Sequence, residues 1–270
     1  MKMNSEFKLT FLGSGSAFYT GEYLGENWQS NILIESPSGR RLLLDCGSDI
    51  RFSLKEQSLN VNDIDDVYIS HLHADHIGGI EWLAFGTKFS ENGRKPNIWA
   101  ERSILKDLWS HSLRGGLGSI EGEDANIHSY FNPHPIRENG GFIWEGIEFR
   151  LVQVVHVMDG FKISPSYGLL FEIGSKRIFF TADTQFAPSQ ISQFYRSADV
   201  ILHDCETADT QSGVHSHYSQ LLNLPVEIRR KMWLYHYQSG CKNDACKDGF
   251  AGWVEKGKKF TFPAILPVAA

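Results

Sequence analysis

The segment SHLHADHIGG, residues 70–79, places three histidines and one aspartate within six positions. It follows DDVYIS, a β-rich run that should enter a hydrophobic core, so the pattern predicts a strand that delivers the cluster into a loop. Imidazole nitrogens and carboxylate oxygens are the ligands that Zn²⁺ and similar divalent metals prefer. The segment offers two ligand pairs that one turn can direct at two adjacent metals. These pairs are His71 with His73, and Asp75 with His76.

A single loop cannot complete the coordination of two metals, so we expect further ligands at the ends of later strands. Three polar residues fit this expectation. His156 ends LVQVVH, Asp183 lies in IFFTADT and His236 lies in WLYHY. Each ends an apolar run, where a polar side chain is costly to bury unless something binds it.

The elements that must position these residues are mostly short strands. In the first half, strands are expected at 7–13, 30–36 and 41–47, and helices at 78–89 and 101–113. The Gly-rich segment RGGLGSIEGED, 114–124, has no apolar periodicity and predicts a mobile loop.

The second half is also expected to consist mostly of short strands. Strands are expected at 142–157, 166–184, 198–206, 233–237 and 258–263, with GSKR (174–177) as a hairpin turn. A helix is expected over 219–232, with Ser219 as its N-cap. No linker separates the halves, so the prediction is one domain over residues 1–270, with helices outside two β-rich halves.

Composition limits the functions that the chain can serve. The net charge is −6 and the 26 basic residues form no long run, which disfavours nucleic acid as a partner without forbidding it. No apolar stretch approaches the length of a membrane helix, and the first residues lack the features of a signal peptide. We therefore expect a cytoplasmic protein with no membrane partner.

The cluster with its distant partners resembles the metallo-β-lactamase superfamily over nearly the whole chain. FLGSGSAF and LLLDCG resemble that superfamily's opening strands, with Asp45 in its first motif. The resemblance implies an α/β fold, a four-layer αβ/βα sandwich of two mixed sheets with helices outside and two metals at one edge. It also implies a ligand set: His71, His73 and His156 on one metal, Asp75, His76 and His236 on the other, and Asp183 bridging both.

Two further segments resemble the ribonuclease Z branch of the superfamily. LHDCET, 202–207, is similar to its His-Glu-Ala-Thr segment, and GVHSHYSQL, 213–221, to its Gly-His-Ser-Thr segment, whose histidine contacts the scissile phosphate. Either His215 or His217 could serve, and the spacing to the following helix favours His217. An aspartate at the bridging position, where penicillin-hydrolysing members typically carry cysteine, argues against antibiotic cleavage.

The chain also departs from ribonuclease Z. It has no long basic arm to clamp tRNA, and ADTQ replaces Gly-Asp-Thr followed by a basic residue. The same core without the arm resembles the branch's cyclic-nucleotide phosphodiesterases. The expected function is that of a binuclear phosphodiesterase acting on small cyclic nucleotides through a metal-bridging hydroxide. The alternatives are a ribonuclease Z-like RNA 3′-end endonuclease and a lactonase or thioesterase on the same metals.

In this interpretation two divalent ions are bound, Zn²⁺ or alternatively Mn²⁺. Asp75 orients the nucleophile, and His217 or His215 stabilises the transition state or protonates the leaving oxygen. Asp204 or Glu206 orients that histidine, and His203 supports it. Branch members commonly dimerise, so we expect a homodimer in which the segment 114–124 covers an active site.

Overall fold

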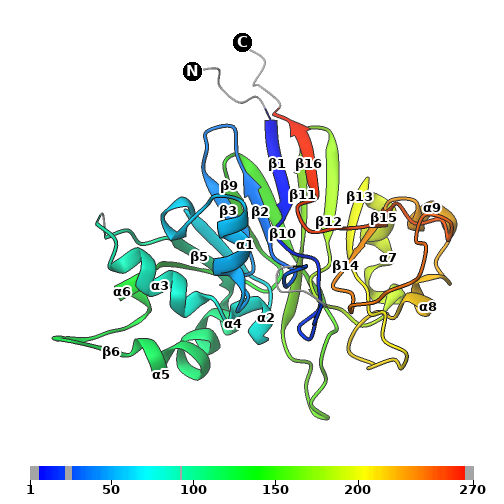
Figure 1. The fold of residues 1–270 in the computed structure, drawn as a ribbon. Helices are drawn as coiled ribbons and strands as arrows, with labels where there is room; N and C mark the ends of the chain where they lie inside the picture. The colour runs from blue at the N-terminus through cyan, green and yellow to red at the C-terminus, as the bar shows by residue number, and fades with distance from the viewer. Residues whose placement is uncertain (1–5, 22–25, 92, 265–270) are drawn as a thin grey trace.

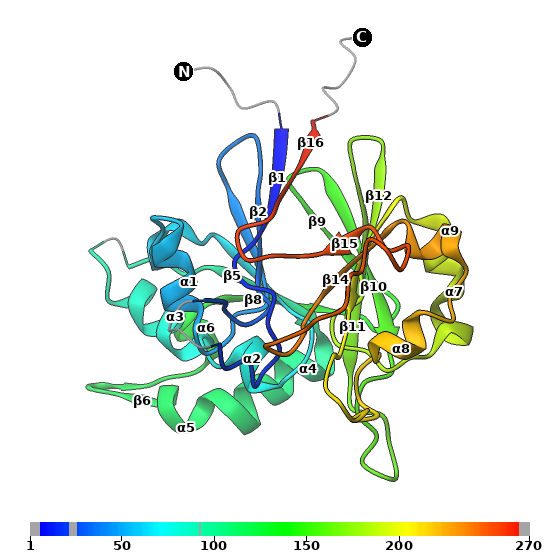
Figure 2. The same ribbon diagram turned by 45° about the vertical axis from the view of Figure 1, so that its right-hand side comes forward.

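The computed structural model describes residues 6–21, 26–91 and 93–264. Two seven-stranded sheets pack face to face, and helices lie on the outer side of each (Figures 1 and 2). This arrangement confirms the expected α/β sandwich. Within the described residues, no helix combines the length and the apolar character needed to span a bilayer.

The first sheet combines strands from the first half of the chain with the last strand. Its order is β16 (Lys259–Pro263), β1 (Glu6–Phe11), β2 (Ile32–Glu35), β3 (Arg41–Leu44), β4 (Asp66–Ile69), β5 (Asn97–Glu101) and β8 (Asn132–Ile136). The strands from β3 to β8 run parallel. Every residue of β4 is buried, as expected for a parallel strand covered on both faces.

The second sheet contains the strands of the second half. Its order is β15 (Gly252–Trp253), β14 (Met232–Tyr235), β13 (Val200–Asp204), β12 (Lys176–Phe180), β11 (Ser166–Ile173), β10 (Ile147–Val154) and β9 (Gly141–Trp144). The turn between β11 and β12 confirms the hairpin expected at GSKR; Gly174 there has φ +64°. Because β10, β12, β13 and β14 point the same way, their C-terminal ends meet at one edge.

The first helix of the first half is α1 (Ile50–Glu56), and in the described part of this half seven further helical segments follow it. They are η1 (Val61–Asp63), α2 (Ala74–Ile77), α3 (Ile80–Lys88), α4 (Arg102–Asp107), η2 (Leu108–Leu113), α5 (Arg114–Leu117) and α6 (Ile127–Tyr130). The helices expected at 78–89 and 101–113 are confirmed as α3 and as α4 with η2, whose last turns are a π-helix.

The prediction of a mobile loop at 114–124 is wrong. The segment forms α5 and then a hairpin of β6 (Ser119–Ile120) and β7 (Glu123–Asp124), which projects from the molecule in Figure 1. Leu117 is buried, and its carbonyl accepts a 2.7 Å hydrogen bond from the Tyr130 hydroxyl. Elements this short leave no periodicity to detect.

The helix expected over 219–232 is also wrong. It is split into α8 (Tyr218–Leu221) and α9 (Val226–Arg229), because Pro225 disfavours helical backbone in the residue before it. His217, not Ser219, is the N-cap of α8. Several helices were not predicted, and the longest of them is α7 (Pro188–Ser197), which covers the second sheet.

Candidate metal centre

Three histidines from two distant segments converge on one point. His73 Nδ1 lies 3.1 Å from His71 Nε2 and 3.1 Å from His156 Nε2. His71 and His73 come from the loop after β4, and His156 follows β10. Asp183 Oδ2 lies 3.8 Å from His71 Nε2 and 3.9 Å from His156 Nε2. These four groups form the first metal-ligand group.

A second ligand group shares Asp183. His76 Nε2 lies 3.1 Å from Asp75 Oδ2 and 3.2 Å from Asp183 Oδ2. His236 Nε2, which follows β14, lies 3.1 and 3.3 Å from the same two oxygens. All four residues are buried. The structure thus brings together all seven residues that the resemblance named as ligands, with Asp183 common to both groups.

The outer nitrogens of several rings are held by neighbouring groups, which orients the inner nitrogens toward the centre. Asp45 Oδ2 lies 2.8 Å from His76 Nδ1 and accepts a 2.7 Å hydrogen bond from the Ser70 hydroxyl. That hydroxyl lies 3.0 Å from His71 Nδ1. Asp45 has φ +62°, a conformation that costs a non-glycine residue energy and is found at functional sites.

The polar atoms of the centre test whether a cation fits. Asp183 Oδ1 is buried and lacks a hydrogen-bond partner. Ring nitrogens that lie 3.1 Å apart suit a shared cation. Imidazole and carboxylate are donors for Zn²⁺ and for related divalent ions, so these residues fit a metal.

The protonation states agree with a metal centre. Burial lowers the pKa of His71 well below its usual value and also lowers the pKa of His73 and His156, which favours the neutral imidazole that binds metal. Burial alone would raise the pKa of Asp183, but His236 and His76 outweigh it and hold that pKa well below its ordinary range. Asp183 is therefore a carboxylate.

His215 lies beside both ligand groups, and with Asp183, Asp204 and His236 it forms a third set of side chains that could hold a metal ion. Its Nδ1 is 2.8 Å from Asp204 Oδ2 and 3.9 Å from Asp183 Oδ2, and its ring stacks on His236 with centroids 4.7 Å apart. Its side chain is 16% exposed, so one edge remains accessible. Burial lowers the pKa of His215, but the carboxylates of Asp204, Asp183 and Glu206 together outweigh burial and raise that pKa to about 10. His215 is therefore a protonated, partly accessible imidazole.

His217, favoured from the spacing, lies elsewhere. Its Nε2 donates to the Ala208 carbonyl at 2.9 Å, and its Nδ1 accepts from the Ser219 amide at 3.2 Å as the N-cap of α8. Both ring nitrogens are therefore engaged in holding the loop and the helix. The sequence pattern could not separate two histidines so close together, and the structure assigns the centre to His215.

The residues expected to orient the histidine have different roles in the structure. Asp204 is fully buried and contacts His215, whereas Glu206 accepts a 2.9 Å hydrogen bond from the Ser212 amide and braces the loop. His203 donates through Nδ1 to the Asp204 carbonyl at 2.6 Å and accepts from the Tyr195 hydroxyl at 2.6 Å. It therefore supports the backbone of Asp204.

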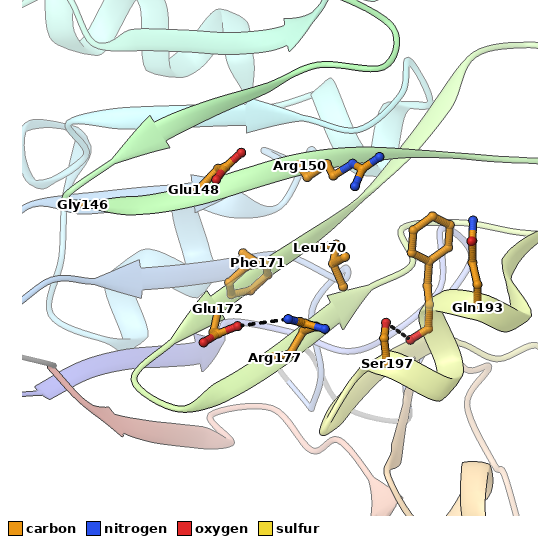
Figure 3. A pocket seen from close by; sticks show the side chains of 10 residues that line it. Gly146, Glu148, Arg150, Leu170, Phe171, Glu172, Arg177, Gln193 and Ser197 are labelled. Atoms are coloured by element: carbon orange, nitrogen blue, oxygen red, sulfur yellow. Dashed lines mark hydrogen bonds and ion pairs between the residues drawn. The ribbon is translucent and has the colours of Figure 1, made fainter.

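A cavity of about 210 Å³ adjoins the first ligand group. Its lining comprises His71, Leu72, His73, Ile104, Asp107, His156, Val157, Lys162, Ser164 and Pro165. A larger groove of about 630 Å³ lies on the outer face of β10, β11 and β12 (Figure 3). Glu172 and Arg177 pair there at 3.4 Å, and none of the residues lining it is a histidine. The smaller cavity is the one connected with the chemistry.

Comparison with known proteins identifies the family. The model of the family described as "Anti-Pycsar protein Apyc1" matches residues 7–260. The chain belongs to this family. Its relatives include the Anti-Pycsar protein Apyc1 of Paenibacillus harenae, 33% identical over 234 residues that cover 85% of this chain and 89% of the relative. The protein of that name from Bacillus phage vB_BveM-Goe7 is 29% identical over 262 residues, covering 93% and 97%.

Solved structures agree with the fold. The metallo-β-lactamase fold protein YhfI from Bacillus subtilis has a TM-score of 0.73 at 19% identity, covering 96% of this chain and 100% of YhfI. The human short-form tRNase Z has a TM-score of 0.67 at 18% identity, covering 95% and 99%. The metallo-β-lactamase resemblance is confirmed. This fold, the family and the histidine–aspartate centre make the chain an enzyme, a metal-dependent phosphodiesterase or hydrolase.

Proposed function

We propose that this enzyme hydrolyses small cyclic nucleotides by attack on the cyclic phosphodiester. The observation that carries the proposal is the pair of His215 and Asp204, which lies at the meeting point of the two ligand groups. A protonated imidazole beside a metal centre suits a reaction in which negative charge develops on phosphoryl oxygens. The relatives' name, Anti-Pycsar protein, is consistent with a small cyclic-nucleotide substrate.

Two divalent ions, Zn²⁺ or alternatively Mn²⁺, would be held by the two ligand groups with Asp183 shared between them. Ions bound there would lower the pKa of a water to about 7 and polarise the phosphoryl oxygens. The protein supplies preformed donors: the ligand nitrogens already converge, and Asp45 and Ser70 hold two of the rings from outside.

His215 acts on the leaving oxygen. Its Nδ1 is occupied by Asp204, which leaves Nε2 as the nitrogen that can donate a proton. Asp204 is itself held by the Thr184 amide at 2.8 Å and through its carbonyl by His203. The pair is therefore oriented before substrate binds. Asp75, beside His76 and His236, is placed to orient the attacking oxygen.

A small substrate suits the surroundings of the centre better than RNA does. The adjoining cavity of about 210 Å³ is smaller than a typical drug-sized pocket of about 300 Å³ or more. Lys162 is the one lysine or arginine among its described lining residues, whereas RNA binding draws on many phosphate contacts. The net charge of −6 points the same way. In this proposal the enzyme is a cytoplasmic homodimer, which light scattering tests.

The decisive experiment assays purified protein, loaded with Zn²⁺ or Mn²⁺, against four substrate classes. These are a panel of 3′,5′-cyclic nucleotides, bis-p-nitrophenyl phosphate, a tRNA precursor with a 3′ trailer, and a panel of lactones and thioesters. We expect cyclic nucleotides to be cleaved with the highest kcat/KM. A preference for the precursor or for the lactones and thioesters would overturn the proposal.

A further inference from the structure

The loop between β10 and β11 carries a lysine into the neighbourhood of the metal centre. This loop, 155–165, projects beyond the end of the second sheet in Figures 1 and 2. Lys162 lines the same 210 Å³ cavity as His71, His73 and His156. A cation and three ligands of the first group therefore line the same cavity.

The loop holds Lys162 in a defined position. The Asp159 carboxylate accepts hydrogen bonds from the backbone amides of Phe161 and Lys162, both at 3.1 Å. The Asp159 amide donates back to the Lys162 carbonyl at 3.1 Å, and Met158 pairs with Ile163 in an antiparallel bridge. The backbone at Lys162 is braced on both sides, and only its side chain must adjust to a ligand.

Within the part of the chain that the structure describes, the ammonium group of Lys162 has no hydrogen-bond partner. Among residues 6–21, 26–91 and 93–264, Lys162 forms no ion pair. Asp107, which also lines the cavity, lies 3.4 Å from His111 on its own helical face. The Lys162 charge interacts with the Asp159 carboxylate of the same loop without forming an ion pair, so this exposed lysine at the cavity wall remains available to an anionic ligand.

The charges around the centre create a need for such a cation. Four buried carboxylates surround it: Asp45, Asp75, Asp183 and Asp204. Two divalent ions would bring four positive charges, which balance these carboxylates and leave protonated His215, assigned above to the leaving oxygen, as a further positive charge at the centre. A phosphodiester adds one negative charge, and in the cavity Lys162 is the lysine or arginine that can offset it.

We propose that Lys162 is a substrate-binding residue whose ammonium group contacts the phosphodiester anion while the sugar and base occupy the adjoining cavity. Leu72, Ile104, Val157 and Pro165 supply apolar wall for that part of the substrate. The inference rests on the proposed function and names a residue that determines substrate affinity. Since lysine is a point charge on a flexible stem, it suits a phosphate whose position is set by other groups.

The test compares Lys162→Gln with Lys162→Arg and a matched control, Lys176→Gln. Lys176 is exposed at the start of β12, at the opposite end of that strand from Asp183. Lys162→Gln should raise KM for cyclic nucleotides and for bis-p-nitrophenyl phosphate by about 10- to 100-fold, as expected for loss of a hydrogen bond between charged groups. The value of kcat should change little, Lys162→Arg should recover most of the affinity, and Lys176→Gln should match wild type.

Two further readouts separate binding from chemistry. Elemental analysis should give the same metal content in all four proteins. Calorimetry with the Rp phosphorothioate analogue of adenosine 3′,5′-cyclic monophosphate should show weaker binding to metal-loaded Lys162→Gln by a similar factor. The wild-type affinity should also fall as salt is added, and less steeply in Lys162→Gln.

The outcomes distinguish the two proposals. An active wild type with unchanged KM and unchanged analogue binding in Lys162→Gln would overturn the role of Lys162 alone. Loss of metal from Lys162→Gln would overturn it as well, because the residue would then be structural. A wild type that binds the analogue, more weakly after Lys162→Gln, but cleaves no diester would overturn the proposed function alone. A metal-loaded wild type that neither binds nor cleaves would overturn both.

Discussion

The loop after β4 and the loop after β13 both present clustered histidines, but they use them differently. In the first loop, residues 70–79, His71, His73, Asp75 and His76 all reach the metal centre. In the second loop, 205–217, His215 reaches the centre, and His217 turns away to cap a helix. Histidines in similar positions after a strand therefore serve the metal centre in one case and stabilise a helix in the other.

The cause lies in the support that each loop receives. The first loop is tied to Asp45, which holds both Ser70 and His76 and so fixes the loop from a neighbouring strand end. The second loop is tied to the centre through Asp204, which lies 2.8 Å from His215 Nδ1, and through the Val214 carbonyl, which accepts a 2.7 Å hydrogen bond from His156 Nδ1. The amides at the start of α8 need an acceptor, and His217 supplies it.

Removing Asp183 should have the largest effect, because it joins the first loop's ligands to His236 and lies near His215. We predict that Asp183→Ala abolishes measurable turnover and loses at least one metal. Steady-state kinetics and elemental analysis measure both. His111→Ala, whose side chain is 72% exposed, is the control and should keep turnover near wild type. The reverse pattern would contradict the assignment of the centre.

His215→Ala should lower kcat by about 10²- to 10⁴-fold, the scale of a general acid or base. Metal content should remain near wild type, because the two ligand groups stay complete without His215. Kinetics with bis-p-nitrophenyl phosphate and elemental analysis of the same sample provide the test. An unchanged kcat would show that the second loop supplies no catalytic group and would favour the lactonase alternative.

Asp204→Asn should lower kcat by about 10- to 100-fold, the effect typical of losing a group that orients a metal-site residue. The asparagine keeps the size of the side chain but removes the negative charge that holds His215. The matched comparison is Glu206→Gln, which alters the brace of the loop without touching His215. If Glu206→Gln is the more damaging of the two, the orienting role belongs to Glu206.

His217→Ala should leave turnover almost unchanged and lower the free energy of unfolding by about 1 kcal/mol, as expected for a lost N-cap. Denaturant unfolding and kinetics measure the two quantities on one preparation. This variant compares the role of His217 with that of His215 most directly. A loss of turnover comparable to that of His215→Ala would show that both histidines act in the chemistry.

The smallest effect is expected from the hairpin β6–β7. Gly118 and Ala125 are already joined by a 3.0 Å hydrogen bond, so two glycines can replace residues 119–124 while Leu117 stays in the core. If the hairpin covers an active site, KM for a small substrate should rise moderately with metal content unchanged. Kinetics identical to wild type would show that the hairpin does not cover an active site.

Pattern and resemblance were sufficient for the sandwich and for the seven candidate ligands. Four of the ligands stood out as a cluster after β4, and the other three because each ends an apolar run; strands that run the same way bring such ends to one edge. The segment 114–124 and the helix over 219–232 were predicted wrongly, because a two-residue strand has no period and Pro225 interrupts an otherwise helical pattern. α7 was missed, although Pro188 at its first position is a typical helix start.

By itself, therefore, the amino-acid sequence determined which groups could bind metal and which strands carry them. The tertiary structure decided which of the two histidines, His215 or His217, joins the centre, because that choice depends on the position of Asp204 and on the first amides of α8. It also decided that Lys162, a lysine without any motif around it, shares a cavity with His73. Local patterns record what a side chain can do, whereas its partners come from distant strands whose approach is set by packing of the whole core.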